Sequence, residues 1–177
     1  MRVLKKLDFS LDESTEKELK IKVKELTAKL KSAIKKEKMR ADIFIGGSFG
    51  KGTLERSEFY DVDIFVRFDK KHKDISNILD KILKKTGEDY EKVHGSRDYF
   101  RIRKGNVDYE FVPVRKIIRP KEAENVTDLS YFHVNFVKKN LGGRTKRGIL
   151  IAKKFFKAQR VYGAESYVNG FSGYAVE

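Results

Sequence analysis

Two aspartates, Asp61 and Asp63, are the residues of this sequence whose type and spacing best fit a metal-binding catalytic site. They lie two positions apart in a segment with strand character, so both side chains leave one face while Val62 points to the other. Two carboxylates on one face repel each other, and the repulsion is costly unless a cation neutralises it. Hard oxygen ligands suit Mg²⁺, which binds through a few carboxylates together with substrate phosphates. The pair therefore predicts a magnesium site.

A glycine-rich segment precedes the aspartates: residues 46–53 read Gly-Gly-Ser-Phe-Gly-Lys-Gly-Thr. Its backbone at Gly47 can approach an anion closely, Ser48 offers a hydroxyl to phosphate oxygens, and Lys51 adds a positive charge. Taken separately, such a turn is usually only a turn, and an Asp-x-Asp pair usually lies on a solvated face. A strand, this glycine-rich turn and then an Asp-x-Asp pair on a second strand together favour a site for a triphosphate and its metal ions.

A third carboxylate is expected from a neighbouring strand, because a two-metal site holds the attacking hydroxyl on one ion and the triphosphate on the other. Asp108 and Glu110 are the candidates. They share one face of a predicted strand, so the geometry admits either of them. The alternative is that one or both lie at a solvated sheet edge.

The first element expected to position these residues is a long helix over residues 11–38. Its apolar residues recur three or four positions apart: Leu19, Val23, Leu26, Leu30 and Ile34. Ser10 and Glu13 predict a capping box at its start. The period then changes, and residues 42–45 and 61–68 are predicted to be strands joined by a turn-rich connection.

The later elements indicate an α+β fold with a small mixed or antiparallel sheet flanked by helices. We predict a helix over residues 74–85, antiparallel strands over 90–94, 99–103 and 107–112, and helices over 130–140 and 144–160. Pro113 is expected to close the third of these strands. We place a boundary near residues 119–127, with a catalytic domain over 1–122 and a small helical, nucleotide-contacting subdomain over 123–177.

The charge of the chain fits a polyanionic partner. Lys and Arg number 40 and Asp and Glu 26, so the formal net charge is +14. A solvated, Lys-rich surface would account for the same charge. The absence of cysteine excludes disulfides and thiolate metal sites, and no apolar run approaches the roughly 20 residues that cross a bilayer. We therefore expect a cytoplasmic protein.

Further motifs carry a family resemblance. They are Gly-Gly-Ser with Gly-Thr-Leu at 46–48 and 52–54, Asp-Val-Asp-Ile-Phe-Val at 61–66, Phe-Val-Pro at 111–113, Asp-Leu-Ser-Tyr-Phe-His at 128–133, Lys-Lys-Phe-Phe-Lys at 153–157, Val-Tyr-Gly-Ala-Glu at 161–165 and Gly-Phe-Ser-Gly-Tyr at 170–174. With these motifs the chain resembles the archaeal (class I) CCA-adding tRNA nucleotidyltransferases. The likeness covers nearly the whole chain, and the last two motifs are not shared by polymerase beta-type nucleotidyltransferases in general.

The resemblance implies a polymerase beta-like fold that adds CMP and AMP from CTP and ATP to the 3′ end of tRNA without a template, releasing pyrophosphate and using two Mg²⁺ ions. By the same resemblance, Asp61 and Asp63 would bind both ions, and Glu110 falls on the family's third aspartate. The positions that match nucleotide contacts of the family are Ser48, Lys51, Ser130, Lys153 and Tyr162, with Ser172 as a weaker candidate.

The sequence departs from the family pattern at three of these positions. Glu110 is one methylene longer than the family's aspartate, Lys51 replaces an arginine fork by a point charge, and Ser130 replaces a threonine. Family members also continue beyond residue 177, into regions that hold the base-reading arginine and the acceptor arm of tRNA. We therefore expect a catalytic head with the beginning of the following domain.

Three residues also have structural interpretations when considered singly. Lys153 belongs to a Lys-rich helix, Tyr162 could be a core aromatic, and His133 is expected in a core or capping position without a catalytic role. Two rival functions stay open: a stand-alone minimal nucleotidyltransferase that modifies protein or makes oligoadenylate, and an RNA-binding module with a degenerate site. The first arises because residues 46–53 also resemble the oligoadenylate synthetases.

Overall fold

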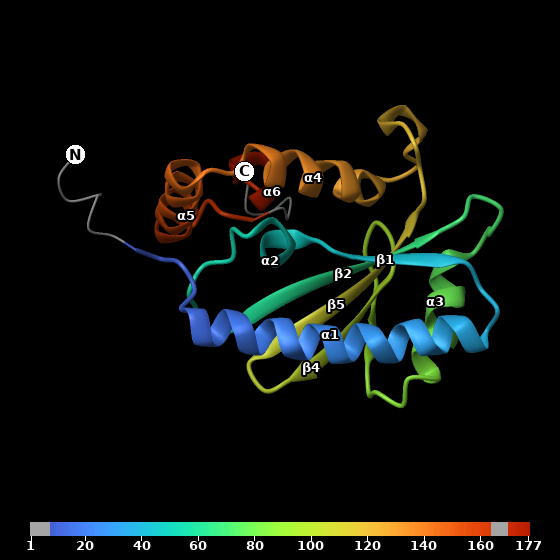
Figure 1. Ribbon diagram of the computed structural model, residues 1–177. Helices are drawn as coiled ribbons and strands as arrows, with labels where there is room; N and C mark the ends of the chain where they lie inside the picture. The colour runs from blue at the N-terminus through green and yellow to red at the C-terminus, as the bar shows by residue number, and fades with distance from the viewer. Residues whose placement is uncertain (1–7, 164–169) are drawn as a thin grey trace.

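The structure, a computed structural model, describes residues 8–163 and 170–177 (Figure 1). In chain order its elements are α1 (Glu13–Lys36), β1 (Ala41–Ile45), α2 (Gly47–Lys51), β2 (Tyr60–Phe68), α3 (Ile75–Lys84), β3 (Glu91–Val93), β4 (Tyr99–Lys104), β5 (Val107–Arg115), the 3-10 turns η2 (Pro120–Glu122) and η3 (Val126–Leu129), α4 (Ser130–Asn140), α5 (Gly143–Ala158) and α6 (Gly173–Val176). Among the described helices, none is both long and apolar enough to cross a bilayer.

The five strands form one mixed sheet in the order β1-β2-β5-β4-β3. β2 and β5 are parallel, and the other neighbouring pairs are antiparallel. The register of the parallel pair places Asp61 opposite Asp108 and Asp63 opposite Glu110. The sheet with its flanking helices confirms the expected α+β class, and the two carboxylate pairs come from its central strands.

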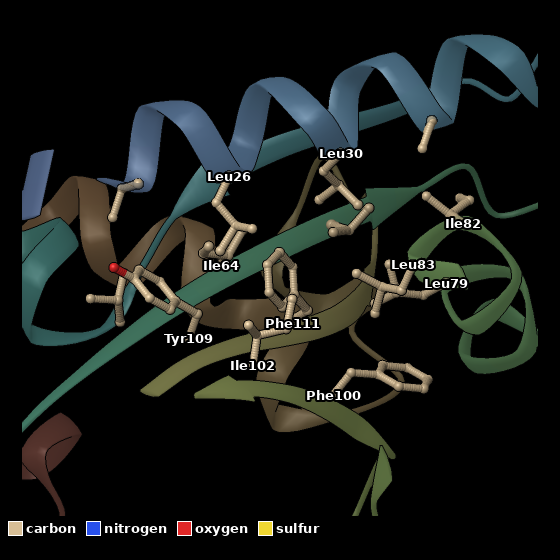
Figure 2. Packing of buried hydrophobic residues seen from close by; sticks show 14 of the residues in the cluster. Leu26, Leu30, Ile64, Leu79, Ile82, Leu83, Phe100, Ile102, Tyr109 and Phe111 are labelled. Atoms are coloured by element: carbon tan, nitrogen blue, oxygen red, sulfur yellow. The ribbon is translucent and has the colours of Figure 1, made fainter. Parts of the chain in front are cut away.

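The main core lies between the sheet and the two helices α1 and α3 (Figure 2). Leu26 and Leu30 of α1 point toward Ile64 and Phe111 of the central strands, and Leu79 extends the cluster from α3. Each of these side chains is buried, and burying one large aliphatic side chain contributes about 1.5–3 kcal/mol. This packing fixes the face of β2 that carries Val62 and Ile64, so Asp61 and Asp63, which alternate with them, must leave the opposite face.

The opposite face carries α2 and the helices α4, α5 and α6, which lie above the sheet on the side away from α1 (Figure 1). Phe65, Val112 and Val114 form a smaller apolar cluster here. Phe44 stacks on Phe65 with ring centroids 4.8 Å apart, and Tyr131 of α4 meets Phe44 edge-on at 5.3 Å. The helical layer therefore packs on the sheet face from which the aspartates emerge. Our division into two domains after residue 122 stays a prediction.

Two local expectations were wrong. The N-cap of α1 is Asp12, whose carboxylate accepts from the Thr15 amide, and the capping box of Ser10 and Glu13 does not form. β5 continues through Pro113 to Arg115. Its pairing with β4 ends at Phe111, so the missing N–H of Pro113 leaves no ladder bond unmade on that side.

Asp128 anchors the connection between β5 and α4. Its buried carboxylate accepts from the Arg97 guanidinium, from the Arg115 amide at 2.8 Å, and from the amides of Glu124 and Asn125 at 3.1 Å each. Burial raises the pKa of Asp128, but the bonds from Arg97 and the backbone outweigh it and hold the pKa below its ordinary value. One carboxylate thus ties the sheet to the start of the helical layer.

We expect Asp128→Ala to lower the free energy of unfolding by about 3 kcal/mol, because it leaves a largely buried guanidinium and three amides without their acceptor. Urea denaturation measures the change. Glu124→Ala is the control, since Glu124 meets Arg115 from an exposed position and such pairs are worth at most about 1 kcal/mol. A loss below about 1 kcal/mol for Asp128→Ala would contradict the anchoring role.

Candidate functional site

The four acidic side chains of the central strands differ in their partners. In the described part of the chain, Asp61 and Asp63 form no ion pair, whereas Asp108 and Glu110 both contact arginines of β4. Asp61 is exposed at the start of β2, and Asp63 is partly buried. Of these four, the two carboxylates that the spacing singled out are therefore the ones without an ion-pair partner among the described residues.

The electrostatic environment of Asp63 opposes its ionised form. Burial, followed by the charge of Glu110, raises the pKa of Asp63 to about 6, although the Lys51 ammonium acts in the opposite direction. The charge of Asp61 adds to the increase. A divalent cation would relieve this repulsion, so the donor set fits Mg²⁺.

The carboxylates alone do not enclose an ion. Within residues 8–163 and 170–177, no three acidic or imidazole side chains are gathered closely enough to form a metal site. Mg²⁺ commonly binds through one or two carboxylates and completes its shell with water and substrate phosphates. The arrangement suits a metal ion that arrives with a phosphorylated substrate.

The choice between Glu110 and Asp108 as the third carboxylate favours Glu110. Arg103 binds Asp108 through two parallel hydrogen bonds of 2.8 and 2.9 Å, and these bonds are the main reason that the pKa of Asp108 is lowered. Arg101 donates to one oxygen of Glu110 at 3.0 and 3.3 Å, yet burial still raises the pKa of Glu110. Glu110 is thus the less neutralised of the two, and it lies opposite Asp63.

Gly47 brings the backbone of α2 against the Asp63 carboxylate. Its φ is +54°, and a Cβ built there would lie 1.6 Å from Oδ2 of Asp63. The preceding amide, of Gly46, donates to the Asp63 carbonyl at 2.8 Å. Only glycine allows the backbone to lie this close to the Asp63 carboxylate. The close approach places Ser48 next to the sheet face that carries Asp61 and Asp63.

Four of the predicted site residues line one small cavity of about 140 Å³: Ser48, Asp61, Lys153 and Tyr162. They come from α2, β2, α5 and the segment after α5. Thr53 lines the same cavity. The fold therefore gathers a hydroxyl, a carboxylate, an ammonium and a phenol from distant parts of the chain. A larger cavity, of about 430 Å³ beside α1, is lined by none of the predicted residues.

The two predicted lysines are buried and already paired. Lys51 and Lys153 both contact the carboxylate of Glu177. Lys153 also donates to the Thr53 carbonyl at 3.2 Å and to its hydroxyl at 3.3 Å. Their charges lie beside the cavity, but their ammonium groups are held by the protein.

The remaining predicted residues lie outside this cavity. Ser130 is the first residue of α4, and Ser172 caps α6 by accepting from the Ala175 amide at 3.2 Å. His133 stacks on Tyr174 with ring centroids 3.7 Å apart, and burial lowers its pKa. The helical layer thus brings neither Ser130 nor Ser172 to the cavity wall.

Several residues of this region were not predicted from the sequence. Glu55 is buried, lines the cavity and pairs with Lys157. Lys157 follows Lys153 by one helical turn, so the spacing along α5 could have indicated that both line one surface. Arg101 faces Glu110 across a strand pair that periodicity alone does not define. No local pattern pointed to Glu177.

Comparisons with known proteins match two parts of the chain. Residues 27–140 match the family of nucleotidyltransferase domains, and residues 147–177 match the second domain of the tRNA nucleotidyltransferases. The chain is 48% identical over 139 residues to the CCA-adding enzyme of Nanoarchaeum equitans, covering 77% of this chain and 34% of that protein. It is 33% identical over 153 residues to the CCA-adding enzyme of Saccharolobus solfataricus, covering 84% and 37%. The chain spans about a third of the length of these relatives.

Solved structures resemble the fold at low sequence identity. The RNA terminal uridylyl transferase Cid1 superposes with a TM-score of 0.69 at 15% identity, covering 98% of this chain and 49% of that one. The non-canonical poly(A) polymerase complex of GLD-2 with GLD-3 gives 0.68 at 14% identity, covering 95% and 52%. These likenesses confirm the expected fold.

Proposed function

Because this chain belongs to the family of nucleotidyltransferase domains, we propose that it adds CMP and AMP from CTP and ATP to the 3′ end of tRNA. The addition needs no nucleic-acid template and releases pyrophosphate. The family implies nucleoside triphosphate substrates and a divalent metal, and the relatives named CCA-adding enzymes support this choice of nucleotides and of tRNA. The net charge of +14 suits a polyanionic partner.

The observation that carries the proposal is the position of Asp63. Its carboxylate lies without an ion-pair partner in the described residues and against the backbone of Gly47. Two positions earlier on β2, Asp61 lines the cavity together with Ser48, Lys153 and Tyr162. A triphosphate in that cavity would bring its oxygens beside the uncompensated carboxylates of β2. No other described cavity combines these groups.

In the proposed reaction, the oxygen of the RNA 3′-hydroxyl attacks the α-phosphorus in line. The new O–P bond forms, the bond to pyrophosphate breaks, and the hydroxyl proton passes to solvent. When bound, two Mg²⁺ ions would lower the pKa of the attacking hydroxyl and offset the negative charge on the attacking and leaving oxygens. Asp61 and Asp63 would hold both ions, and Glu110 would complete the ligand set at the RNA hydroxyl.

The other residues would bind and orient the triphosphate. Ser48 offers its hydroxyl and the neighbouring backbone to phosphate oxygens, and Lys51 and Lys153 place positive charge behind the cavity wall. Tyr162 forms part of the wall, where burial raises its pKa to about 12, so it acts as a neutral hydrogen-bonding group. Orientation and charge are the main protein contributions to phosphoryl transfer.

Product analysis with labelled nucleotides tests the proposal against its rivals. We expect α-labelled CTP and ATP with Mg²⁺ to label a tRNA that lacks its terminal CCA, and CTP alone to stop after the cytidines. Labelled protein or short oligoadenylates would instead indicate the stand-alone nucleotidyltransferase. Binding of RNA without Mg²⁺-dependent binding of nucleotide would indicate a degenerate RNA-binding module.

A further inference from the structure

Glu177 lies at the centre of a buried charge cluster that joins three segments of the chain. Its side chain is fully buried and contacts Lys51 of α2 and Lys153 of α5. It also accepts a bond from the Thr53 hydroxyl at 2.5 Å. One carboxylate, at the C-cap of α6, therefore connects the glycine-rich segment with α5 and α6.

The hydrogen bonds of Lys153 show what this cluster holds in place. An ammonium group has three donors, and those of Lys153 reach the Thr53 carbonyl, the Thr53 hydroxyl and the Glu177 carboxylate. Thr53 in turn donates its amide to the Ser48 carbonyl at 2.9 Å. The cluster thus fixes both ends of the turn from Ser48 to Thr53, which lines the cavity beside Asp61.

The charges of the cluster make Glu177 necessary for this arrangement. Burial and the nearby charge of Lys51 both lower the pKa of Lys153, while Glu177 opposes them. Without Glu177, two neighbouring buried ammonium groups would have no anion between them. One of them would lose its proton or turn toward solvent, since an unpaired buried charge is costly. In either case the turn from Ser48 to Thr53 would lose its support.

We propose that Glu177 is a positioning residue for triphosphate binding: through Lys51, Lys153 and Thr53 it holds the phosphate-facing turn in its binding geometry. The inference rests on the proposed function, because it assigns the triphosphate to the cavity that this turn lines. Glu177 itself lies behind the cavity wall and does not touch the triphosphate. Its effect is on how well the turn is shaped before the nucleotide arrives.

Glu177→Gln tests the proposal, because it keeps the size of the side chain and removes its charge. We expect the affinity for ATP with Mg²⁺, and that for inorganic tripolyphosphate without metal, to fall about tenfold by calorimetric titration. The KM for nucleotide should rise by a similar factor, while kcat at saturation changes less than about threefold. A purely structural role would lower the melting temperature without moving KM well below that temperature.

Glu88→Gln is the matched control. Glu88 also bridges two lysines, Lys29 at 2.6 Å and Lys104 at 2.5 Å, and its side chain is largely buried. It lies on the α1 side of the sheet, away from the cavity. Its nucleotide affinity should stay within about twofold of wild type.

Binding by Glu177→Gln that is reduced less than about threefold, in a folded protein, would overturn the proposal. If that variant does not fold, Glu177→Asp takes its place: it keeps the charge but is too short for both lysines, and at least a threefold loss is expected by the same measure. Failure of both variants to fold would make the cluster structural and the proposal wrong. If the wild-type protein binds ATP but extends no RNA, only the proposed function is contradicted. If the wild-type protein extends RNA and Glu177→Gln binds ATP equally well, only the role of Glu177 is contradicted.

Discussion

Asp63→Asn is expected to abolish metal-dependent nucleotide incorporation while the protein stays folded. Asparagine keeps the shape of the side chain but removes the charge that would hold both metal ions, so the rate should fall at least about a thousandfold. Incorporation of labelled nucleotide into RNA at saturating Mg²⁺ measures the loss. Near-normal turnover by the purified variant would contradict the metal site.

The same substitution should stabilise the protein in the absence of metal. Because the pKa of Asp63 is about 6 in the folded state and about 4 in the unfolded chain, the folded state binds more protons between these values. The contribution of Asp63 to the free energy of unfolding is therefore most favourable below pH 4, and this contribution is lost as the pH rises through 6. We expect Asp63→Asn to gain about 2 kcal/mol over wild type at pH 7.5 and little at pH 4. Urea denaturation at the two pH values, with chelator present, measures the difference.

Asp108→Asn is the control for both effects. Asp108 lies on the same sheet face, but Arg103 already neutralises it through two bonds. We expect its rate to stay within about tenfold of wild type, and its stability without metal not to increase. Loss of activity equal to that of Asp63→Asn would show that Asp108, in place of Glu110, completes the site.

Gly47→Ala is expected to reduce the rate of nucleotide incorporation at least about a hundredfold. A methyl group there would lie 1.6 Å from Oδ2 of Asp63 and must displace either that carboxylate or α2. The positive φ adds a backbone strain of about 1–2 kcal/mol. Steady-state kinetics and thermal denaturation measure the two consequences.

Gly105→Ala separates backbone strain from the collision. Gly105 has a similar φ of +61°, and nothing lies within 4 Å of a Cβ built there. This variant should lose stability to a similar backbone strain and keep nearly full activity. Equal activity of the two alanine variants would show that the close contact between Gly47 and Asp63 does not matter for the reaction.

Local patterns in the sequence were sufficient to predict most of the elements. The three- and four-residue spacing of Leu19 to Ile34 predicted α1, because one apolar stripe along a helix is readable within a short window. The predicted cap of α1 was wrong, since Ser10 and Asp12 are both good caps, and Ser10 forms a β-bridge with Glu55, a long-range contact that no local pattern shows. The prediction that Pro113 ends the strand was wrong, because the point at which β4 stops pairing with β5 is a long-range property.

The candidate site shows the same division. That Asp61 and Asp63 share a face follows from strand geometry alone. That Glu110 lies opposite Asp63 follows only from the parallel pairing of β2 with β5, which no local pattern specifies. The contact of Glu177 with Lys51 and Lys153 joins segments far apart in the chain, so spacing could not reveal it.

The most direct test of the proposed nucleotide addition is to map the nucleotides added to a tRNA that lacks its last three residues. The tRNA is incubated with the protein, CTP, ATP and Mg²⁺, and its 3′ ends are then sequenced. We expect ends that read C-C-A with wild type and Mg²⁺, and no added nucleotides without Mg²⁺ or with Asp63→Asn. Unextended tRNA with folded wild-type protein, or C-C-A ends with Asp63→Asn, would contradict the proposed reaction.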